Sequence, residues 1–120
     1  MSSETIDVVG CEMPREVVPR AYLADGGIWP AGPLVPDAPP GAHLGQAIAE
    51  ALRAAMERQR LGARELSRLT GSQVTHPTVM TVLQGSRLPS VHTVLLLEVA
   101  LKAPLYPAGL HAELADGQEP

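Results

Sequence analysis

Residues 61–89 read LGARELSRLTGSQVTHPTVMTVLQGSRLP, and this stretch decides the fold. Within it, Leu66 and Leu69 give residues 63–70 one apolar side at helical spacing. Gly71 follows at once, and glycine readily adopts the left-handed backbone that ends a helix. The first part of the stretch therefore predicts a short helix that stops at a glycine turn.

The second part of the stretch predicts another short helix, from about Thr75 to Gln84. Thr75 or His76 can cap its start, and Pro77 is tolerated in a first turn because the amide there would be unpaired anyway. Gly85 stops it. Its buried stripe is expected to consist of Val79, Val82 and Leu83.

Further helices are predicted on both sides of this pair. Apolar residues recur at helical spacing over 44–59, and polar residues take the other side. The segment from Val91 to about Lys102 is apolar nearly all round, so one side should face the core and the other should meet either the proline-rich arm or a second subunit. Leu110 and Leu114 suggest a short final helix. The sequence thus predicts a mainly α fold of four to five helices.

Residues 1–40 hold seven of the twelve prolines and form an acidic arm or linker in this interpretation. The segments 16–23 and 28–35 flank an Asp-Gly-Gly step that favours a chain reversal, while prolines within them remove donors from any strand pairing. The residues leave open whether the arm is a short β-hairpin or irregular. We therefore divide the chain into this arm, a helical domain over 41–115 and a disordered end over 116–120.

Composition narrows the class of protein. A chain of 120 residues with 45% hydrophobic residues can bury one modest core. Cys11 is the only cysteine, which excludes an internal disulfide and favours a reducing, cytoplasmic environment. The longest strongly apolar run, near 94–101, is far shorter than the roughly 20 residues that a bilayer span needs, so we expect no membrane segment.

Charge is distributed unevenly along the chain. The formal net charge of the whole chain is −4, but residues 41–90 contain six arginines and three acidic residues. The positive charge therefore coincides with the central helices. For each arginine, contact with a polyanionic partner and a plain solvated helix surface are equal alternatives.

Signatures of catalysis or metal binding are weak. The four histidines are dispersed, with no His-x3-His or Cys-x2-Cys spacing to hold zinc. No phosphate-cradling glycine motif and no credible nucleophile and base pair appear. We expect no enzyme activity, no metal and no cofactor.

The quoted segments resemble the lambda/Cro-type (Xre-type) phage-repressor family of helix-turn-helix regulators over roughly 44–114. LGARELSRLTG is similar to the positioning helix and turn, VTHPTVMTVLQG to the recognition helix, and VHTVLLLEVALKAPL to the packing helix. The family's small residue, turn glycine and branched anchor correspond to Ser67, Gly71 and Val79. The resemblance implies a lambda-repressor-like helix bundle from a bacterium or phage.

The resemblance implies that the helix Thr75–Gln84 enters the major groove of double-stranded DNA and that His76, Pro77, Met80 and Thr81 face the bases. The residues implied to contact phosphates flank these four: Arg64, Thr75, Gln84, Ser86 and Arg87. Simpler roles compete with three of the assignments. Met80 could merely cover apolar surface, Thr75 could merely cap its helix, and Arg64 could merely pair with acidic neighbours.

Two departures from the family pattern stand out. Eight positions separate Gly71 from Val79 where the family usually has about six, so Ser72 and Gln73 lengthen the turn. Ala63 occupies the position where the family often has a phosphate-gripping glutamine. The expected function is a sequence-specific DNA-binding transcriptional regulator, a repressor, acting as a homodimer on a two-fold-related operator.

A protein-interaction module on the same scaffold is the alternative, such as an antitoxin of a toxin pair or a partner-binding regulator. The predicted recognition helix lacks basic residues, and the acidic arm over residues 1–40 could lie along a basic partner.

Overall fold

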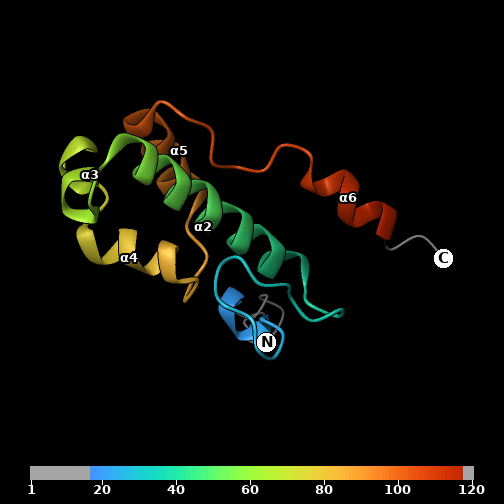
Figure 1. The fold of residues 1–120 in the computed structure, drawn as a ribbon. Helices are drawn as coiled ribbons and strands as arrows, with labels where there is room; N and C mark the ends of the chain where they lie inside the picture. The colour runs from blue at the N-terminus through green and yellow to red at the C-terminus, as the bar shows by residue number, and fades with distance from the viewer. Residues whose placement is uncertain (1–16, 118–120) are drawn as a thin grey trace, which may run out of the picture.

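The computed structural model describes residues 17–117; the parts of the arm and of the C-terminal end predicted at 1–16 and 118–120, including Cys11, lie outside the described residues. In the described part the chain is mainly helical, as predicted. A 3-10 turn, η1, spans Pro19–Tyr22, and five α-helices follow (Figure 1). Their bounds are α2 Pro40–Gln59, α3 Ala63–Leu69, α4 His76–Gln84, α5 Val91–Leu101 and α6 Leu110–Gly117.

One apolar core unites α2, α3, α4 and α5. Helix α2 supplies Ile48, Leu52, Ala55 and Met56, and α3 supplies Leu66, whose side chain is completely buried. The other buried members come from the turn, from α4, from α5 and from the segment after it: Val74, Val79, Val82, Val94, Leu97, Leu101 and Leu105. The cluster contains no aromatic residue, so aliphatic side chains and Met56 fill it.

Helix α2 begins four residues earlier than the apolar periodicity predicts. Pro40 is its first residue and Pro39 its N-cap, which is possible because a proline at the first helical position gives up an amide that would be unpaired in any case. The extra turn matters for packing, because Ala42 and Gly45 lie buried on it. Pro19 of the arm fits against Gly45, where any added Cβ would collide with the proline ring.

Residues 17–39 form an irregular arm, so the hairpin alternative is wrong for the described part of the chain. The expected reversal is present at Asp25 and Gly26, with the Gly27 amide donating to the Ala24 carbonyl at 3.0 Å. Only one isolated antiparallel bridge, Leu23 with Leu34, joins the two sides. Prolines on both sides lack the amides that would extend the pairing, which explains why no strand forms among these residues.

Helix α5 and the segment after it are tied together by Glu98. Its carboxylate accepts hydrogen bonds from the Leu105 amide at 2.7 Å and the Tyr106 amide at 3.0 Å. These two bonds lower the pKa of Glu98 below its ordinary value, because they stabilise the charged form. The turn at 102–106 is thereby closed back onto α5, and Leu105 is placed in the core.

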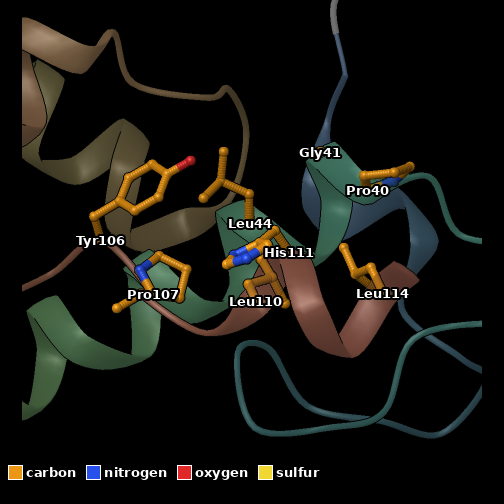
Figure 2. Close-up of a pocket in the computed structure, with 9 residues that line it drawn as sticks. Pro40, Gly41, Leu44, Tyr106, Pro107, Leu110, His111 and Leu114 are labelled. Atoms are coloured by element: carbon orange, nitrogen blue, oxygen red, sulfur yellow. The ribbon is translucent and has the colours of Figure 1, made fainter. Parts of the chain in front are cut away.

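Helix α6 lies beside the start of α2, apart from the other helices (Figure 1). It includes Asp116 and Gly117, two residues that were predicted to belong to the disordered end. A hollow of about 270 Å³ separates α6 from α2, with Leu44, Leu110 and Leu114 among its lining residues (Figure 2). None of the helices in residues 17–117 combines the length and apolar character needed to cross a bilayer.

Helix α3 offers a direct test of the core. Leu66→Ala should lower the free energy of unfolding by about 2–5 kcal/mol, because it removes a fully buried side chain and leaves a cavity. Leu69→Ala is the matched control on the same helix, since Leu69 is 54% exposed and its loss should change stability by no more than about 0.5 kcal/mol. Urea unfolding followed by circular dichroism measures both. Equal losses in the two variants would contradict the described packing of α3.

Candidate nucleic-acid interface

Helix α4 has an inner and an outer side. Val79 is fully buried and Val82 is 3% exposed, so these two valines hold the helix against the core. Pro77 and Gln84 are exposed, and the other residues outside the valine pair are partly exposed: His76, Thr78, Met80, Thr81 and Leu83. All four residues predicted to read bases therefore have accessible surface on one short helix.

The turn before α4 is closed by hydrogen bonds in spite of its extra length. Gly71 and Ser72 both have left-handed backbones, with φ of 70° and 63°. The buried Thr70 hydroxyl donates to the Ser67 carbonyl at 2.6 Å and accepts from the Val74 amide at 3.1 Å. Val74 is 2% exposed, so the chain re-enters the core before α4 begins. Ser72 and Gln73, the two residues that lengthen the turn, thus lie within a turn that the Thr70 hydroxyl closes by hydrogen bonds.

Thr75 is the N-cap of α4; the sequence had allowed either Thr75 or His76 in this role. Its hydroxyl oxygen accepts from the Thr78 amide at 3.4 Å and lies 3.0 Å from the Thr78 hydroxyl. The simpler, capping role of Thr75 is therefore present. Because a hydroxyl oxygen has two lone pairs and one hydrogen, capping leaves capacity for a further partner.

Thr81 and Ser86 are less available as donors than the sequence suggests. The Thr81 hydroxyl donates to the Pro77 carbonyl one turn earlier at 2.8 Å, and the Ser86 hydroxyl donates to the Thr81 carbonyl at 3.4 Å. Each oxygen keeps acceptor lone pairs. As arranged, Thr81 can accept from a base amino group or present its methyl group to a thymine, and donation to a base would require it to rotate.

The structure brings Thr81 and Arg87 together around a shallow hollow of about 310 Å³. Three further hydroxyl residues line this hollow, namely Thr78, Ser90 and Thr93. Ser90 caps α5 by accepting from the Thr93 amide at 3.0 Å. Ser90, Thr78 and Thr93 were not among the predicted site residues, because nothing in the spacing shows that the start of α5 adjoins α4.

Two of the residues predicted to contact phosphates, Gln84 and Arg64, are not among those that line this hollow. Gln84 is exposed at the end of α4, and Arg87 is exposed in the loop that follows. Arg64 is exposed on α3 and does not line the hollow. Among the described residues the only salt bridge joins Arg53 to Glu57, so the alternative in which Arg64 pairs with an acidic neighbour is not found there.

The arm fixes the far end of α4, which the sequence interpretation missed. The Trp29 indole nitrogen donates to the Leu83 carbonyl at 3.0 Å, and the Arg20 amide donates to the Gly85 carbonyl at 3.0 Å. The six-membered ring of Trp29 lies directly on Gly85, where no Cβ would fit. Gly85 also has a φ of 67°, so glycine is required there twice over.

The arm is itself anchored to α2. The Gln46 side-chain amide donates to the carbonyls of Pro30 at 2.8 Å and Gly32 at 2.5 Å. Residues 17–39 thus connect the start of α2 to the end of α4 without covering the exposed residues of α4. The sequence does contain one signal of this contact, since Trp29 is a lone tryptophan within a proline-rich segment. Its partner, the Leu83 carbonyl, could not be inferred from residue spacing.

Comparison of this chain with protein-family models, with curated proteins and with solved structures finds no match.

Replacing the indole tests whether the arm holds α4. Trp29→Phe removes the donor to Leu83 and keeps an aromatic ring, so it should lower the free energy of unfolding by about 0.5–1.5 kcal/mol. Hydrogen exchange should speed up at the Gly85 and Ser86 amides, which close the end of α4. Tyr106→Phe is the control, because Tyr106 is 54% exposed and should show neither effect. Unchanged exchange at the end of α4 in Trp29→Phe would contradict a holding role for the arm.

Proposed function

We propose that the protein is a sequence-specific DNA-binding transcriptional regulator of the lambda/Cro (Xre) type, a repressor, with α3 and α4 as its helix-turn-helix. One observation carries the proposal: α4 keeps the side chains of His76, Pro77, Met80 and Thr81 accessible while Val79 and Val82 fix it to the core. A helix presented in this way fits the major groove, with its amino-terminal residues nearest the base edges.

Charge around α4 supports this proposal. Arg64 on α3 and Arg87 after α4 are exposed cationic residues on the elements that flank α4 in sequence. Such residues would bind phosphates and set the register, while α4 itself, which carries no charged residue, reads bases. His76 and Thr81 would then discriminate between bases, and DNA shape and the spacing of two half-sites would add to the sequence specificity.

A homodimer is part of the proposal because α5 has an unpaired apolar stripe. Val91 is 81% exposed, Leu95 53% and Val99 66%, and these residues recur every four positions on one side of the helix. The described part of the arm, residues 17–39, lies against α2 and α4, which favours a second subunit over the arm as the covering of this stripe. A two-fold pair would present two α4 helices to a symmetric operator.

The same stripe, with the uncharged surface of α4, favours a second candidate, a protein-interaction module such as an antitoxin or a partner-binding regulator. In that case an apolar partner would cover Val91, Leu95 and Val99. The two functions are compatible, because an antitoxin often binds both its toxin and its operator.

Variants of Arg87 test the proposed phosphate contacts, and variants of His76 and Thr81 test the proposed base contacts. Arg87→Ala should weaken binding to every duplex tested and reduce the slope of log affinity against log salt by about 1, because one phosphate contact is lost. Lys102→Gly is the charge-matched control: Lys102 follows α5, and its left-handed φ of 55° suits glycine. Fluorescence anisotropy with labelled duplexes across a salt series measures both.

His76→Ala and Thr81→Ala should instead alter preference at defined base positions, by about 1–3 kcal/mol per position. Full affinity and an unchanged salt slope in Arg87→Ala, together with unchanged base preference in the His76 and Thr81 variants, would contradict the proposed function.

A further inference from the structure

A groove of about 460 Å³ lies where the arm, the end of α2 and the end of α4 meet. Trp29 and Pro30 line it from the arm, and Leu83 and Gln84 line it from α4. Its volume falls within the range of about 300–1,000 Å³ that is typical of small-molecule sites. The groove is separate from the hollow beside Thr81 and Arg87, with which it shares no lining residue.

The walls and the rim of this groove differ in chemistry. Apolar side chains supply the walls: Trp29, Pro30, Met56, Leu61 and Leu83. The rim carries Arg53, Glu57 and Arg60. Arg53 Nη1 lies 3.7 Å from Glu57 Oε2, so these two residues form a salt bridge. That pair balances its own charge, whereas Arg60 is in no salt bridge among the described residues. The rim therefore has one unbalanced positive charge beside an apolar, partly aromatic surface.

We propose that this groove binds a small aromatic carboxylate. Its ring would pack against Trp29 and Leu83, and its carboxylate would pair with the guanidinium of Arg60, a geometry in which arginine binds with two parallel hydrogen bonds. An uncharged ligand would leave the positive charge on the rim unbalanced, and a cation would be repelled by it. The site goes beyond the proposed DNA binding and stands or falls independently of it.

The backbone at Arg60 makes a clean variant available. Arg60 has a left-handed φ of 56° at the C-cap of α2, so Arg60→Gly removes the guanidinium at a position where glycine is conformationally favoured. Trp29 is the only tryptophan of the chain, so its fluorescence reports on the groove without interference from another indole.

The experiment titrates the full-length chain with phenylacetate and follows both Trp29 fluorescence and the heat of binding. Phenylacetate should bind and change the emission of Trp29. Phenylacetamide, which has nearly the same shape without the charge, should bind about tenfold more weakly, and Arg60→Gly should weaken phenylacetate binding by about the same factor. Arg58→Ala is the matched control, because Arg58 lies on the same helix and does not line the groove.

Absence of phenylacetate binding, equal affinity for the acid and the amide, or equal affinity in the wild-type chain and Arg60→Gly would each overturn the proposal. The comparison of acid with amide uses the unaltered chain, so it decides the question even if the variant fails to fold. None of these measurements includes DNA, so their failure leaves the proposed regulator function untouched.

Discussion

Helix α4 has nine residues, and a helix of that length is marginal on its own in water. It is held instead by groups outside it: Thr75 caps its start, two valines anchor its middle, and Trp29 and Arg20 of the arm bind carbonyls at its end. The irregular, proline-rich arm therefore has a structural role, because it binds the carbonyls at the end of α4. It also leaves the outer side of α4 accessible, and the proposed DNA binding depends on that accessibility.

The helices and the turn between α3 and α4 could be predicted from the sequence because their causes are local. Apolar spacing, a threonine cap and glycines at the two helix ends are properties of a few neighbouring residues. The early start of α2 was missed because Pro39 and Pro40 were counted as helix breakers, whereas a first-turn proline is compatible with a helix. Of the two alternatives left open for the arm, the irregular one is found in residues 17–39, since prolines leave only the bridge between Leu23 and Leu34.

The candidate site was only partly predictable, because its remaining features depend on contacts between distant segments. Trp29 lies 54 residues from Leu83, and no periodicity or motif connects them. Ser90 and Thr93 join Thr81 at one hollow only because the start of α5 lies next to α4. The groove proposed to bind a carboxylate likewise exists only where three separate segments meet. Sequence patterns therefore identified the helix, and the tertiary fold determined its neighbours.

Selection of preferred duplexes from a random pool tests the central claim most directly, because it asks whether α4 reads DNA at all without assuming an operator. If α4 reads bases in a homodimer, the pool should be enriched in an inverted repeat whose half-sites are about one helical turn apart, as expected for two copies related by a two-fold axis. Failure to enrich any sequence under low-salt conditions would contradict DNA reading by α4 and favour the protein-interaction module.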